Sequence, residues 1–162
     1  MTRDNVTLLS FISFLLFSGL YNVEGELIQW RPCPYPNAAT ASNCTIHEVY
    51  VDPCEDAASG KPCNFKRGIS ANMTFHYTPS FSSESIQGGI YWTIDSIDIP
   101  ILSVRSNPCS LTTCPLEAGQ KNIYHLETTV RRYPLREYDL KWRIWNDQQE
   151  ECCFIYQITI TR

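Results

Sequence analysis

The sequence has no excess of positive charge and no long segment of uniform composition. Its 162 residues contain 13 Lys and Arg against 17 Asp and Glu, which gives a formal net charge of −4 at pH 7. Because the phosphates of a nucleic acid select for a basic protein surface, this balance argues against a nucleic-acid partner. No repeat, charge block or low-complexity linker interrupts the chain. A single domain is therefore the simplest organisation.

The motifs of the common catalytic and cofactor-binding sites are also missing. The chain has no G-x-S-x-G, no H-E-x-x-H, no P-loop and no G-x-G-x-x-G sequence. Its three histidines, His47, His76 and His125, lie on separate segments. We therefore expect no enzymatic activity and no cofactor.

A helical pattern is absent as well, because no stretch keeps apolar residues at a 3.6-residue spacing. Ten prolines and seven glycines instead separate short runs in which polar and apolar residues alternate. Alternation predicts β-strands, since successive side chains of a strand point to opposite faces. We expect strands over residues 45–52, 69–77, 86–94, 121–130, 138–145 and 152–161. This pattern of short strands and turns predicts an all-β, immunoglobulin-like two-sheet sandwich.

The amino end carries the one long apolar run, LLSFISFLLFSGL at residues 8–20. This run is too short to span a bilayer but has the length of a signal-peptide core. With Arg3 before it and Val23 and Gly25 after it, we expect a signal peptide over 1–25 and a mature domain over 26–162. Eight cysteines fit an oxidising compartment. The expected location is extracellular, with the lysosomal lumen as the alternative.

Two glycosylation sequons fit this secretory route, Asn43-Cys44-Thr45 and Asn72-Met73-Thr74. Asn72 is the better candidate, because a disulfide at Cys44 would tie up the chain beside Asn43. If Asn72 faces water, period two places Ala71, Met73, Phe75 and Tyr77 together on the opposite face.

The inward faces of the expected strands are rich in aromatic side chains. These are Phe75, Tyr77, Trp92, Trp142, Phe154 and Tyr156. They either fill a core or surround a pocket whose rim offers hydrogen-bond partners to Tyr and Trp. Periodicity alone leaves both interpretations open.

The spacing of the cysteines restricts their pairing. Cys54 and Cys63 flank a turn-rich segment, and Cys109 and Cys114 bracket a tight turn. Adjacent strand residues point to opposite faces, so Cys152 and Cys153 should bind two different partners near the amino end. Zinc is not expected, because the cysteines lack the usual two-plus-two arrangement and the route favours oxidation.

Several cysteine-bearing segments together resemble a known family. They are CTIHEVYVDPC at 44–54, KPCNFKRG at 61–68, NPCSLTTCP at 107–115, RRYPLREYDLKWRIWND at 131–147 and ECCFIYQITI at 151–160. In this order they resemble the ML lipid-recognition domain, within it the Niemann–Pick type C2 group, and especially its arthropod secreted members. The resemblance covers nearly the whole expected mature chain.

The resemblance implies a sandwich with a hydrophobic cavity between its sheets, which holds a lipid without chemical change. It implies the disulfides Cys54–Cys63, Cys109–Cys114 and Cys33–Cys153, and hence Cys44–Cys152. The opposite pairing of the two long-range partners stays open at this point. Fatty acids, long-chain semiochemicals and sterols are all candidate ligands. A lipid-loaded adaptor for an immune or chemosensory receptor is the alternative function.

Several cavity residues are carried over from the resemblance. They are a gating apolar residue at Ile101, Val130 and Tyr133 near a Tyr-Pro pair, and an inward tryptophan at Trp142. With the inward-facing residues, the full expected cavity lining is Phe75, Tyr77, Trp92, Ile101, Val130, Tyr133, Trp142, Ile144, Phe154 and Tyr156. The expected partners are a small hydrophobic ligand and a membrane receptor or lipid acceptor protein, and the expected state is a monomer.

Overall fold

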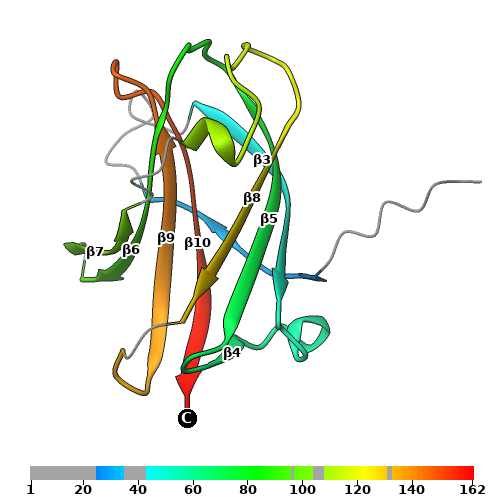
Figure 1. The fold of residues 1–162 in the computed structure, drawn as a ribbon, viewed down its shortest axis with the longest axis vertical. Coiled ribbons are helices and arrows are strands. Elements are labelled where there is room, and N and C mark those ends of the chain that lie inside the picture. The colour runs from blue at the N-terminus through cyan, green and yellow to red at the C-terminus, as the bar shows by residue number, and fades with distance from the viewer. Residues whose placement is uncertain (1–24, 35–42, 96, 104–107, 131–132) are drawn as a thin grey trace, which may run out of the picture.

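Two β-sheets packed face to face make up the computed structural model, which describes residues 25–34, 43–95, 97–103, 108–130 and 133–162 (Figure 1). One sheet has the strand order β1-β3-β5-β8. Its strands are β1 (Glu26–Leu27), β3 (Cys44–Asp52), β5 (Ser70–Pro79) and β8 (Asn122–Thr129). Each neighbouring pair in this sheet is antiparallel.

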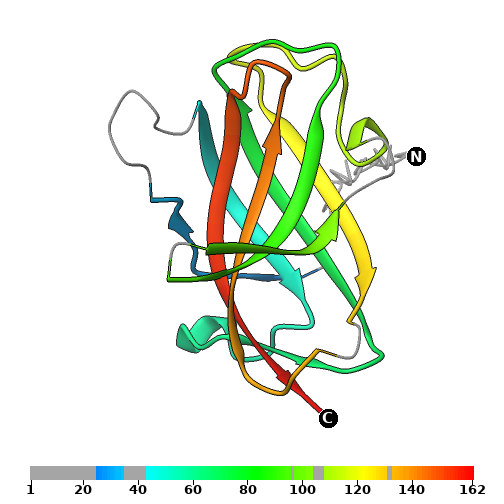
Figure 2. The same ribbon diagram turned by 90° about the vertical axis from the view of Figure 1, so that its left-hand side faces the viewer.

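The second sheet has the strand order β2-β10-β9-β6-β7. Its strands are β2 (Arg31–Pro32), β10 (Glu151–Thr161), β9 (Glu137–Trp145), β6 (Gln87–Ile94) and β7 (Ile97–Ser103). A short strand, β4 (Cys63–Lys66), runs parallel to the carboxyl-terminal half of β10. Figure 2, turned by a quarter, shows the red β10 and orange β9 in front of the green β5 and yellow β8.

Helical structure in the described residues consists of two single 3₁₀ turns, η2 (Ala57–Ser59) and η3 (Pro108–Ser110). Over this part of the chain, no helix is long and apolar enough to cross a membrane. The prediction of an all-β two-sheet sandwich is confirmed.

All the long alternating runs form the strands predicted for them, but four strands were missed, namely β7 and the short β1, β2 and β4. β7 contains Pro100, which argues against a strand in sequence. Pro100 is tolerated because β7 lies at the edge of its sheet, where one side of the backbone needs no partner. β4 was missed because four residues give no recognisable alternation.

Alternation also places the side chains as predicted. Along β5, the inward residues Ala71, Met73, Phe75 and Tyr77 are buried, while the residues of the other face from Asn72 to Thr78 are half-buried. β9 repeats this pattern, with Trp142 and Ile144 buried. β10 departs from it, because Cys153 and Ile155 on its outer face are buried with Cys33 in a small second cluster.

Aromatic rings fill the space between the sheets at one level of the sandwich. Trp142 has no exposed surface, and its ring centroid lies 4.3 Å from Phe75, 4.7 Å from Tyr124 and 5.7 Å from Phe154. Trp142 and Phe154 belong to one sheet, and Phe75 and Tyr124 to the other. We call these four residues the aromatic core. They hold the sheets together through large buried apolar area and edge-to-face contacts.

Four disulfides account for all eight cysteines. Cys44–Cys152 joins β3 to β10, and Cys54–Cys63 joins the chain after β3 to β4. Cys33–Cys153 ties the segment after β2 to β10, and Cys109–Cys114 closes a loop between β7 and β8. These are the pairs that the family resemblance implies. Three of them lie along the β3–β10 side, and none links β8 to the facing sheet.

Removing the central ring of the aromatic core should lower stability strongly. We expect Trp142→Ala to reduce the free energy of unfolding by about 3–5 kcal/mol, because a fully buried indole leaves a cavity behind. Trp145→Ala is the matched control, since Trp145 is half-buried on the outer face under Arg143, and should cost about 1 kcal/mol or less. Urea unfolding followed by far-UV circular dichroism measures both. Equal losses would contradict the role of Trp142.

Candidate functional site

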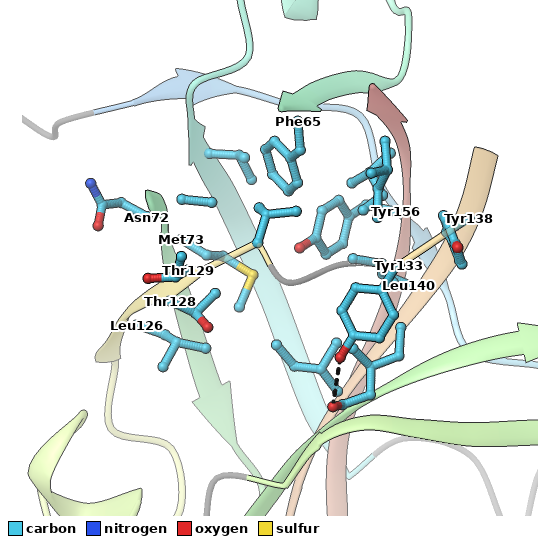
Figure 3. A pocket seen from close by; sticks show the side chains of 17 residues that line it. Phe65, Asn72, Met73, Leu126, Thr128, Thr129, Tyr133, Tyr138, Leu140 and Tyr156 are labelled. Atoms are coloured by element: carbon cyan, nitrogen blue, oxygen red, sulfur yellow. Dashed lines mark hydrogen bonds between the residues drawn. The ribbon is translucent and has the colours of Figure 1, made fainter. Parts of the chain in front are cut away.

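An apolar cavity of about 80 Å³ lies between the two sheets, on the side of the aromatic core toward the carboxyl end of β10 (Figure 3). Both sheets contribute to its walls. The apolar lining residues are Val51, Phe65, Ala71, Met73, Ile90, Ile101, Leu126, Val130, Leu140, Ile158 and Ile160. The polar lining residues are Asn72, Thr128, Thr129, Tyr133, Tyr138 and Tyr156. None of these side chains carries a charge.

A change in side-chain size along the strands produces this cavity. On β5, the inward residues pass from Tyr77 and Phe75 in the filled part to Met73 and Ala71 at the cavity. On β10 the same change occurs from Phe154 to the isoleucines at its end. Two sheets held at one spacing by large rings therefore leave space where the rings are replaced by small or aliphatic groups.

A hydrogen bond ties the rim of the cavity to the edge strand β7. Tyr133 Oη donates to the carbonyl oxygen of Ile101 at 3.1 Å, shown by the dashed line in Figure 3. The Tyr133 carbonyl in turn accepts from Arg67 Nε at 2.8 Å. Tyr138, another lining residue, donates from its hydroxyl to the carbonyl of Pro134 at 2.9 Å. The rim is thus closed by contacts of a tyrosine rather than by a covalent link.

Only part of the expected cavity lining surrounds the cavity. Ile101, Val130, Tyr133 and Tyr156 line it. The other aromatic candidates and Ile144 do not. Phe75, Tyr77, Trp142, Ile144 and Phe154 have no exposed surface and are packed at the level of the aromatic core.

Trp92 is the remaining candidate outside the lining. It lies beside the cavity, with its ring 4.9 Å from that of Tyr138 and the Arg136 guanidinium 3.7 Å above it. The expected lining differs from the observed lining because a two-residue period predicts which face of a strand a side chain is on, but not how far along the strand the cavity lies. The lining residues that were missed, such as Leu126 and Leu140, carry a weak signal. They are ordinary inward aliphatic residues, and their small size marks the cavity only once the sheets are aligned.

The buried tyrosines differ in their hydrogen bonding. Tyr77 shares a hydrogen bond of 2.9 Å with Thr112 Oγ1, and burial raises its pKa to about 12. In the aromatic core, Tyr124 Oη and Trp142 Nε1 have no hydrogen-bond partner in the described part of the chain. Burial likewise raises the pKa of Tyr124, and that of Tyr156 in the cavity wall.

The three histidines belong to the outer face of the four-stranded sheet, away from the cavity. His47 bonds to Thr78 Oγ1 at 2.9 Å, and His125 bonds to Thr74 Oγ1 at 2.8 Å. His76 Nδ1 lies 3.0 Å from a Glu48 carboxylate oxygen. Within the described residues, no group of three or more His, Cys, Asp or Glu side chains could hold a metal ion.

Both glycosylation candidates are described, and both are half-buried. Asn72 stands at the edge of the cavity wall, with its side chain directed away from the cavity (Figure 3). The backbone amide of Asn43 donates to the Glu151 carbonyl at 2.9 Å, and the adjacent Cys44 is bridged. Glycosylation of Asn72 and Asn43 stays a prediction. The expected signal peptide lies outside the described residues, apart from Gly25.

Comparisons with known proteins agree with this geometry. A family model for the ML domain matches residues 27–160. An MD-2-related lipid-recognition protein from Manduca sexta is 28% identical over 127 residues, which cover 76% of this chain and 81% of that protein.

Two solved structures are similar in fold. A Niemann–Pick type C2 protein from the Japanese carpenter ant matches with a TM-score of 0.68 at 16% identity, over 83% of this chain and 100% of that chain. The carboxyl-terminal domain of wzt matches with a TM-score of 0.50 at 11% identity, over 75% of each chain. At these identities the two structures support the fold alone.

Proposed function

The chain belongs to the ML-domain family, and on this premise we propose that it binds a lipid between its two sheets and carries it through an aqueous compartment without chemical change. The candidate ligands are a fatty acid, a long-chain semiochemical and a sterol. The proposal includes secretion, which rests on the amino-terminal apolar run and the four disulfides.

The observation that carries the proposal is the uncharged cavity between the sheets. Transfer of apolar surface from water into such a space is favourable by about 25 cal/mol for each Å². Aliphatic walls make few directional contacts, so they accept chains and rings of different shape. The Manduca sexta relative, named a lipid-recognition protein, supports the same class of ligand.

Binding requires the cavity to widen. Its volume of about 80 Å³ is below the about 300–1,000 Å³ of typical ligand sites. The β3–β10 side is fixed by disulfides, whereas the side formed by β8 and β7 has no covalent link. We therefore propose that ligand enters on the β8–β7 side, where breaking the bond between Tyr133 and Ile101 frees the rim.

Native mass spectrometry of the secreted protein, followed by denaturing extraction, tests the function directly. We expect a one-to-one complex with a lipid whose mass is released by denaturation. A protein that carries no lipid, and that also fails to take up any member of a panel of fatty acids, long-chain alcohols and sterols, would contradict the proposal.

Filling the cavity should abolish uptake without unfolding the protein. Ala71→Leu places three more carbons in the wall, and we expect affinity for a fluorescent fatty acid to fall about five- to hundredfold. Ala57→Leu is the matched control, because Ala57 is buried in η2 but does not line the cavity. Fluorescence titration measures both affinities. Similar affinities of the two variants would exclude the cavity as the binding site.

The surface beside the cavity suggests where the ligand is delivered. Ile97 and Ile99 on β7 are 65% and 41% exposed. Their strand partners are Ile94 and Trp92, so the four side chains share one face. Since Trp92 contacts Tyr138 of the lining, this apolar face extends from the rim. We propose that it meets the lipid acceptor, which is a membrane or a membrane receptor.

A charge on this face should slow delivery but not binding. We expect Ile97→Glu to reduce the rate of transfer of a fluorescent fatty acid to phosphatidylcholine vesicles several-fold, because a carboxylate must be desolvated on contact. Ile123→Glu is the control, since Ile123 is 53% exposed on the opposite sheet. Stopped-flow fluorescence measures the transfer rates. Equal rates for the two variants would remove this face from delivery to membranes.

A further inference from the structure

One tyrosine in the cavity wall has a hydroxyl that no described residue contacts through a hydrogen bond. Tyr156 is 5% exposed, and its hydroxyl makes no hydrogen bond with any described residue. The two other tyrosines of the lining, Tyr133 and Tyr138, each donate to a backbone carbonyl. In Figure 3 the Tyr156 hydroxyl points into the space between the sheets.

Such a group is unfavourable for the folded protein by itself. A hydroxyl that faces an apolar cavity without a hydrogen-bond partner in the protein is poorly solvated there, and phenylalanine has the same shape without this defect. Packing therefore does not explain a tyrosine at this position, since the inward neighbours Phe154 and Ile158 on β10 are apolar. A ligand that accepts the hydrogen bond does explain it.

The surroundings restrict what that ligand group can be. None of the described residues that line the cavity carries a charge, so the cavity wall itself does not offset the charge of a carboxylate that enters it. Burial raises the pKa of Tyr156, which therefore stays protonated and able to donate at physiological pH. The suited acceptor is a neutral oxygen.

We propose that Tyr156 donates a hydrogen bond to a hydroxyl, carbonyl or ester oxygen of the bound lipid, so that the cavity selects neutral oxygenated lipids over hydrocarbons and over lipids whose carboxylate would enter first. This inference rests on the proposed function and narrows its ligand class. It also gives the ligand a direction. Tyr156 is on β10, whereas Ile101 at the rim is on β7, with β9 and β6 between them. The oxygenated group thus lies toward the disulfide-linked side, away from Ile101.

Displacement of N-phenyl-1-naphthylamine from the full-length secreted protein tests the proposal. The competitors are hexadecane, 1-hexadecanol and 2-hexadecanone, which share one chain length and differ in the oxygen. In the wild type we expect the alcohol and the ketone to bind more tightly than hexadecane. Tyr156→Phe should lower the affinity for both oxygenated compounds about two- to tenfold and leave the affinity for hexadecane unchanged, because the substitution removes one hydrogen bond and little volume.

Tyr77→Phe is the matched control, since it removes a buried hydroxyl that already shares a hydrogen bond with Thr112 and does not line the cavity. It should lower the midpoint of urea unfolding without changing the preference for oxygenated chains. Tyr156→Phe should leave that midpoint unchanged or raise it. The inference fails if the wild type binds the three compounds with equal affinity, or if Tyr156→Phe lowers the affinity for all three by the same factor. If neither the dye nor any competitor binds the wild type, the proposed function fails and this inference fails with it.

Discussion

The spacing of the two sheets is the constraint on which the rest of the structure depends. The aromatic core sets this spacing, because Trp142 from one sheet contacts Phe75 and Tyr124 from the other with no exposed surface. The strands continue past these rings with smaller inward residues, such as Ala71. The closely packed rings keep the sheets apart, and the smaller side chains one or two residues further along the same strands cannot fill that spacing. The cavity results from this difference.

The disulfides make the two sides of the sandwich unequal. Cys44–Cys152 and Cys54–Cys63 fix β3 to β10 and β4 at both ends of β3. On the other side, the hydrogen bond from Tyr133 to Ile101 closes the rim. A hydrogen bond contributes about 0.5–1.5 kcal/mol, whereas a covalent bridge does not open thermally. A molecule with this asymmetry can widen on one side without losing the arrangement of its core.

The sequence predicts the fold further than it predicts the site. Strict alternation in residues 69–77 and 138–145 is enough to give the strands and their buried faces, because one face of each sheet is covered. The position of the cavity depends on which residues of different strands lie level with one another. That alignment comes from strand pairing such as Phe75 with Tyr124, which no single strand encodes. Hence Trp142 was expected in the cavity wall and lies in the core.

The hydroxyl and indole groups that lack a hydrogen-bond partner among the described residues do not all have the same meaning. Tyr124 Oη and Trp142 Nε1 belong to rings that contact edge to face, with centroids 4.7 Å apart. In that environment the electron-rich ring faces act as weak hydrogen-bond acceptors. These two donors are present because large rings are needed to fill the core. Tyr156 stands instead beside open volume, where phenylalanine would fit as well. The stability of the fold does not require the Tyr156 hydroxyl. Because this hydroxyl lies where we propose that the lipid binds, its presence is best explained by recognition of that lipid.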